Sequence, residues 1–95
     1  VSAFGRKMAA MEGAEAALGV ASGMAAIYCA IRQLMPQGGH VIASKTIYGG
    51  TYALFANILP QCGIEVSFVD TNSVSEIEKA AKANTKVLYV ETMSN

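Results

Sequence analysis

Three short blocks of the sequence combine glycine, hydroxyl, aromatic and carboxylate groups in a way that could hold a ligand. They occupy residues 21–25 (ASGMA), 46–51 (TIYGGT) and 91–95 (ETMSN). Each lies at the expected end of a β-strand, and open α/β sheets bind ligands at the carboxyl ends of their parallel strands. Together the blocks would supply an anion cradle, an aromatic plate and a polar cluster. This combination fits a flat, phosphorylated cofactor better than a metal ion or a nucleic acid.

The first block predicts a helix N-terminus at Ser22, Gly23 and Met24. The first N–H groups of a helix have no intrahelical partner, and the helix dipole adds about half a positive charge there. Because Gly23 has no Cβ atom, its backbone can approach a phosphate closely. The alternative is an ordinary helix start that Ser22 caps. The chain has no Gly-x-Gly-x-x-Gly fingerprint and no Walker-type lysine, which disfavours dinucleotide and nucleoside-triphosphate sites.

The second block carries an aromatic side chain that its neighbours cannot shield, because Tyr48 is followed by Gly49 and Gly50. A tyrosine held on such a loop can stack on a flat ligand, and its hydroxyl can donate a hydrogen bond or transfer a proton. The alternative is a turn tyrosine whose ring packs on the edge of the sheet.

The other polar and sulfur side chains give weaker indications. Glu91, at a strand end, could orient neighbouring polar groups or help to set a cofactor's protonation, or it could belong to a cluster that caps the next segment. Asp70 is expected to cap a turn, and His40 is expected to be an exposed loop residue. Cys29 and Cys62 are far apart and are expected to be reduced and buried, which favours a cytoplasmic protein.

Predicted strands and helices alternate along the chain. Strands are expected over 16–21, 40–44, 64–69 and 86–91, and helices over 6–12, from 22 to about 35, over 51–59, and from 73 or 75 to about 83. Helices of about ten residues between strands predict βαβ units. The expected fold class is therefore α/β, with a mostly parallel sheet and flanking helices.

Composition limits the classes of protein to which the chain could belong. A length of 95 residues suffices for one small domain. With 53% hydrophobic and 15% charged residues, the chain is more apolar than a lone small domain needs, so we expect it to be a piece of a longer protein, truncated at both ends. Lys and Arg together number 7, as do Asp and Glu, which disfavours nucleic-acid partners and anionic membranes. No apolar run reaches the roughly 18 residues of a membrane span.

Taken jointly, the blocks resemble the pyridoxal-phosphate enzymes of cysteine and methionine metabolism, the trans-sulfuration family. The resemblance runs from Met11 to Asn95 and includes Tyr48-Gly49-Gly50-Thr51. It implies that residues 1–95 are part of the large domain of a fold-type I pyridoxal-phosphate-dependent enzyme. It also implies a homotetramer built from dimers that share active sites, and a sulfur amino acid as the small-molecule substrate.

The resemblance further implies roles for individual residues. The backbone N–H groups of Gly23 and Met24 would hold the cofactor phosphate. Tyr48 would stack on the pyridine ring and assist leaving-group chemistry. Asn95 would approach the ring hydroxyl of the cofactor, with Glu91 beside it as a supporting group.

Some features of the family have no counterpart here. Neither Lys45 nor Lys86 matches the motif of the Schiff-base lysine, and Met93 stands where many members carry proline. The nearest resemblance is to carbon–sulfur lyases of the methionine gamma-lyase type. O-acetylhomoserine sulfhydrylase and cystathionine gamma-lyase or gamma-synthase are alternatives within the family. An alternative from another class is a non-catalytic α/β module that binds phosphate.

Overall fold

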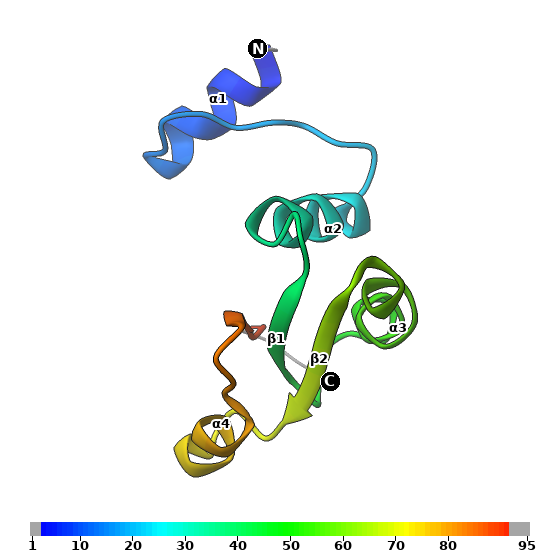
Figure 1. Ribbon diagram of the computed structural model, residues 1–95. Helices are drawn as coiled ribbons and strands as arrows, with labels where there is room; N and C mark the ends of the chain where they lie inside the picture. Colours follow the sequence, from blue (N-terminus) through cyan, green and yellow to red (C-terminus); the bar gives the residue numbers. More distant parts are fainter. Residues whose placement is uncertain (1–2, 92–95) are drawn as a thin grey trace.

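The computed structural model describes residues 3–91, in which helices and strands alternate along most of the chain (Figure 1). In chain order the elements are α1 (Ala3–Glu12), α2 (Gly23–Leu34), β1 (Gly39–Ser44), α3 (Gly49–Ala53), η1 (Leu54–Ile58), η2 (Leu59–Cys62), β2 (Ile64–Val69), α4 (Val74–Ala80) and β3 (Thr85–Tyr89). The π-helical turn η1 and the 3-10 turn η2 continue α3 without a break.

The three strands form a parallel sheet in the order β2-β1-β3. Strand β1 pairs with β2 from Gly39↔Ile64 to Ser44↔Val69, whereas its pairing with β3 is interrupted by an irregularity between His40 and Val41. Each connection between consecutive strands contains helix, so the predicted βαβ units and α/β class are confirmed.

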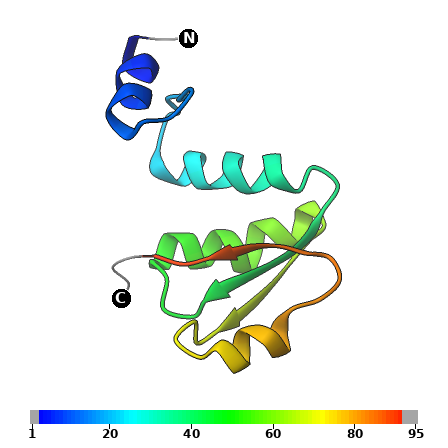
Figure 2. The same cartoon turned by 90° about the vertical axis from the view of Figure 1, so that its left-hand side faces the viewer.

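Helices cover both faces of the sheet. Helix α2 and the helical segment from α3 to η2 lie on one side, and α4 lies on the other (Figures 1 and 2). The core forms between the sheet and the first of these layers, and its buried members are Ile31, Met35, Val41, Ala43, Ile47, Leu54, Phe55, Leu59 and Ile64. Strand β1 is central and nearly fully buried, so the loops at its two ends are held by a rigid element.

The strand predicted over 16–21 does not form. Residues 14–22 have no helix or strand and are almost all exposed. A strand is stable only when a neighbour satisfies its N–H and C=O groups, and none of the described strands lies beside this segment. Its alanines and Gly19 also have low strand propensity. The predicted stop of the first helix at Gly13 is confirmed, because Gly13 adopts a left-handed φ of 67°.

The helix predicted to close at Pro60 instead continues to Cys62. The Leu59 N–H bonds to the Leu54 carbonyl five residues back, and Pro60 then falls in the first turn of η2. A proline is tolerated there because its missing N–H would have no partner in that turn. The segment ends at Gly63, whose φ of 79° is left-handed.

His40 is buried, so the prediction of an exposed loop residue is wrong. Its Nδ1 atom lies 2.6 Å from Thr85 Oγ1 and its Nε2 atom lies 2.8 Å from Ser67 Oγ, which links the central strand to both neighbours. The Thr85 hydroxyl oxygen also accepts the Lys82 N–H at 2.8 Å, so its own proton is available for Nδ1. This arrangement favours a neutral imidazole that carries its proton on Nε2 and donates it to Ser67.

Acidification is therefore expected to destabilise the protein. Burial, and secondly the charge of Lys82, lower the pKa of His40 below 6.5, against a smaller opposing effect of Glu65. Below about pH 6.5 the unfolded chain binds a proton that the folded chain binds less readily, so the free energy of unfolding falls as pH decreases. Urea unfolding of wild type and His40→Gln between pH 7.5 and 5.5 measures this slope. Equal slopes would contradict the prediction.

The cysteines also differ from their expected state. Both are free thiols, but Cys29 is exposed and Cys62 is half-buried, so the prediction that both are buried is wrong. The Tyr28 hydroxyl lies 3.8 Å from Cys62 Sγ on the side of α2 that faces the core. Asp70 behaves as expected, because its carboxylate accepts the Asn72 N–H at 3.0 Å and closes the turn after β2.

Candidate functional site

At the carboxyl end of the sheet, the loop after β1 is hydrogen-bonded to Glu91, which lies two residues beyond the end of β3. Glu91 Oε1 accepts the Tyr48 backbone N–H at 2.9 Å. The other oxygen, Oε2, accepts the Tyr89 hydroxyl at 3.3 Å. Strands β1 and β3 are neighbours, with Ala43 opposite Tyr89, so the sheet itself places these groups together. The prediction that Glu91 could orient neighbouring polar groups agrees with this geometry.

The Tyr48 ring lies over Gly50 and remains 59% exposed. A Cβ atom added to Gly50 would lie 2.7 Å from Tyr48 Cε2 and 3.5 Å from Met24 Sδ. Only glycine therefore leaves room for the ring in this position. Because Tyr48 is more than half exposed, part of its side chain is accessible to a ligand.

The N-terminus of α2 has the geometry of a capped helix. Ser22 is extended, with φ −160° and ψ 165°, and its hydroxyl accepts the Ala25 N–H at 3.0 Å. The cap predicted from the sequence is confirmed. A Cβ atom built on Gly23 would meet nothing within 4 Å, so the packing of the described chain does not require glycine there. A side chain at position 23 would therefore point into space that the described residues leave empty.

The predicted phosphate-binding helix start and the loop that carries Tyr48 are in contact through the Met24 side chain. The Thr51 hydroxyl lies 4.0 Å from the Met24 sulfur, which also adjoins Gly50 beneath the Tyr48 ring. The start of α2 and the loop of residues 46–51 thus share one edge of the fold. Asn95, the remaining predicted site residue, lies outside the described residues.

Tyr89 is a member of this cluster that the sequence analysis did not identify. Burial raises the pKa of its phenol, and the charge of Glu91 and the hydrogen bond to Glu91 act in the same direction. The phenol is therefore protonated at neutral pH and donates to the carboxylate. Strand alternation could have indicated the contact, because side chains two positions apart on a strand lie on the same face.

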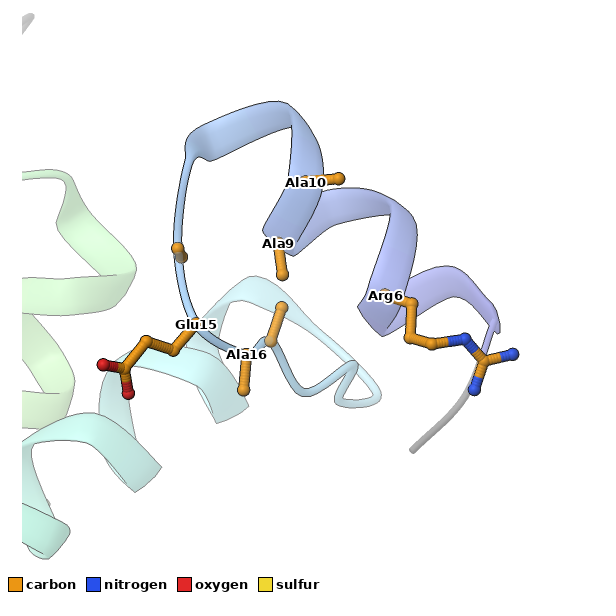
Figure 3. Close-up of a pocket in the computed structure, with 7 residues that line it drawn as sticks. Arg6, Ala9, Ala10, Glu15 and Ala16 are labelled. Carbon is orange, nitrogen blue, oxygen red and sulfur yellow. The ribbon is translucent and has the colours of Figure 1, made fainter.

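A pocket of about 370 Å³ lies apart from this cluster, between α1 and residues 14–17 (Figure 3). Its lining residues are Arg6, Ala9, Ala10, Ala14, Glu15, Ala16 and Ala17. The Arg6 and Glu15 side chains extend in opposite directions away from the alanines (Figure 3). Because these two charged side chains do not point toward each other, this pocket is a poor candidate for a catalytic site.

Residues 3–91 contain no group of His, Cys, Asp and Glu side chains that could hold a metal ion. None of the helices in this range has the length and apolar character needed to cross a membrane.

The chain forms an open α/β sheet, and the cluster of Tyr48, Tyr89 and Glu91 lies at the carboxyl ends of its strands. Proteins of this class bind ligands at that end of the sheet. A family model described as "Cys/Met metabolism PLP-dependent enzyme" matches residues 1–95. The chain belongs to this family, and the expected resemblance is confirmed.

Individual relatives agree with the family. L-methionine gamma-lyase from Fusobacterium nucleatum subsp. polymorphum is 46% identical over 89 residues, which cover 94% of this chain and 22% of that protein. The solved structure of O-acetylhomoserine sulfhydrylase from Wolinella succinogenes superposes with a TM-score of 0.89 at 39% identity, covering 97% of this chain and 26% of that one. An O-acetylhomoserine (thiol)-lyase structure from Campylobacter jejuni contains N'-pyridoxyl-lysine-5'-monophosphate. It gives a TM-score of 0.87 at 38% identity and covers 97% of this chain and 23% of that one.

The chain spans about a quarter of the length of these relatives. The likeness to the two solved structures confirms the predicted fold class, an α/β fold with a parallel sheet. The cofactor of the family is pyridoxal phosphate, as the resemblance implied.

Proposed function

We propose that the chain is a segment of the cofactor-binding large domain of a longer enzyme, here called the parent enzyme. The parent enzyme cleaves a carbon–sulfur bond in a sulfur amino acid, in the manner of a methionine gamma-lyase. The similarity to L-methionine gamma-lyase supports this activity. One observation carries the proposal: Met24, at the N-terminus of α2, and the exposed Tyr48 both lie next to Gly50.

The residues at this edge fit pyridoxal phosphate. A Cβ atom on Gly23 would meet nothing within 4 Å, which supports a phosphate bound close to this backbone by the N–H groups of Gly23 and Met24. The exposed Tyr48 ring offers a stacking face for the pyridine, and its hydroxyl can pass a proton to a leaving group. Asn95 is assigned to the ring hydroxyl of the cofactor. When bound, pyridoxal phosphate supplies the electron sink that elimination chemistry requires.

A sulfhydrylase activity is the second candidate within the family. It is favoured by the similarity to O-acetylhomoserine sulfhydrylase, whose fold superposes over 97% of this chain. Both activities would use the same cofactor contacts, so they differ in substrate and not in the proposed roles of Gly23, Met24 and Tyr48. A non-catalytic phosphate-binding module would need only the cradle at α2.

The assembly and compartment of the parent enzyme are part of the same proposal. We assign it to a homotetramer built from dimers, as the family resemblance implies. Large apolar side chains such as Phe4, Met11 and Leu18 are 62%, 69% and 86% exposed, and the rest of the parent enzyme or a partner subunit would cover them. We assign it to the cytoplasm, with which the two free cysteines are compatible.

Two neighbouring variants of the parent enzyme test the phosphate cradle. Gly23→Val should raise the dissociation constant of pyridoxal phosphate about tenfold or more, because its side chain fills the space in front of the helix N–H groups. Ser22→Ala removes the observed cap and should cost about 1 kcal/mol of stability with little effect on affinity. Titration of both apo variants with cofactor, followed by absorbance, compares them directly.

The proposal would be contradicted if the two variants bound the cofactor equally well and differed only in thermal stability. The segment would then be a plain helix start. Binding of pyridoxal phosphate without cleavage of any sulfur amino acid would instead favour the phosphate-binding module.

A further inference from the structure

Tyr48 starts a helix whose first residues are conformationally permissive. Its φ and ψ are −52° and 139°, and no side chain at that position caps the helix. Gly49 and Gly50 follow, and glycine has a low helix propensity because its backbone has many other accessible states. Local sequence therefore does little to hold the tyrosine loop in one conformation.

The side chain of Tyr48 is largely exposed. The residue is 59% exposed, and the Cδ2–Cε2 side of its ring lies next to Gly50. Its orientation consequently depends on the backbone that carries it. That backbone is tied to β3 by the bond from the Tyr48 N–H to Glu91, which is 43 positions away in sequence.

Glu91 is itself held in place. One carboxylate oxygen accepts the Tyr48 N–H at 2.9 Å, and the other accepts the Tyr89 hydroxyl at 3.3 Å. The Tyr89 ring in turn meets the buried Phe55 ring edge-on, with 4.9 Å between centroids. A hydrogen bond to a carboxylate is stronger than one between neutral groups. A continuous series of contacts thus connects the core to the backbone of the tyrosine loop.

We propose that Glu91 is a positioning residue, whose carboxylate clamps the loop that carries Tyr48 to the end of β3 and so presents the tyrosine ring to the cofactor. The part of this inference that concerns the cofactor rests on the proposed function. The clamp itself is a property of this chain and can be measured without ligand.

The test uses the parent enzyme with Glu91→Ala, Glu91→Gln and Tyr89→Phe. Hydrogen exchange at the Tyr48 amide should become about tenfold faster in Glu91→Ala, because the amide loses its acceptor. Glu91→Gln should retain most of the protection, since its side-chain oxygen can still accept the Tyr48 N–H. Tyr89→Phe should give a smaller increase, because it frees only one end of the carboxylate.

A matched control is available at the opposite end of the sheet. Glu65 is also a solvent-accessible carboxylate, and it bonds Lys82 at 3.0 Å and Asn84 at 3.4 Å. Glu65→Ala should leave exchange at the Tyr48 amide unchanged. Titration of the apo variants should show cofactor affinity reduced several-fold in Glu91→Ala and unchanged in Glu65→Ala.

The proposal would be overturned by wild-type exchange at Tyr48 in Glu91→Ala, or by a Glu91→Gln variant as impaired as Glu91→Ala. Failure of the proposed function has a different signature. In that case Tyr48→Ala would leave cofactor affinity unchanged, while Glu91→Ala would still accelerate exchange at the Tyr48 amide and so support the clamp.

Discussion

Replacing Tyr48 by phenylalanine in the parent enzyme is expected to slow turnover by about 10²–10⁴-fold, the usual contribution of a group that transfers a proton. Phenylalanine keeps the ring over Gly50 and loses only the hydroxyl, so cofactor affinity should stay close to wild type. Tyr48→Ala should weaken cofactor binding as well, because it also removes the stacking face. Steady-state kinetics and cofactor titration measure the two effects separately.

Tyr52 provides the matched control for this experiment. It lies four residues further along and is 46% exposed, but its ring stacks on Phe68 with 4.6 Å between centroids. Tyr52→Phe should therefore leave turnover unchanged. Wild-type turnover in Tyr48→Phe would exclude the proton-transfer role, even if Tyr48→Ala still lost cofactor.

The largest effect on stability is expected from Phe55→Ala. Phe55 is fully buried between the sheet and the helical layer, and its ring contacts Tyr89. Truncation would remove this packing and leave a cavity, which typically costs about 3–5 kcal/mol of unfolding free energy. Urea unfolding followed by circular dichroism measures the loss.

Phe55→Leu is the corresponding control, because leucine fills most of the space and should cost about 1 kcal/mol. A Phe55→Ala variant no less stable than Phe55→Leu would show that the surrounding side chains collapse into the space.

The elements that sequence patterns predicted well are those whose signals are local. The strand at 64–69 combines β-branched and aromatic residues between breaks, and it forms over Ile64–Val69 as predicted. Ser22 precedes an apolar helical pattern, and its hydroxyl caps α2. Glu91 was predicted to orient polar groups at the end of a strand. Strand β3 ends two residues earlier, at Tyr89, but the Glu91 carboxylate accepts the Tyr48 N–H and the Tyr89 hydroxyl.

The features that were missed depend on partners far away in sequence. His40 reads as a loop residue after two glycines, yet Ser67 and Thr85, 27 and 45 positions away, supply hydrogen bonds that make its burial favourable. Residues 16–21 have the pattern of a strand but no strand beside them in the described chain. The alternative of a capped helix start at Ser22 is compatible with the geometry, so the roles of Gly23 and Met24 stay predictions.

The sheet order has a consequence for synthesis on the ribosome. Strand β1 is central, yet it precedes both of its neighbours in the chain. The backbone N–H and C=O groups at its edges therefore emerge unpaired, and about 40 residues separate its end from the start of β3. At about 5–20 residues per second, this exposes at least one edge of β1 for about 2–8 s in every nascent chain. During that interval the unpaired edge of β1 can pair with the same strand of a chain on a neighbouring ribosome, which would start aggregation. A chaperone that binds the nascent β1 segment would prevent this pairing.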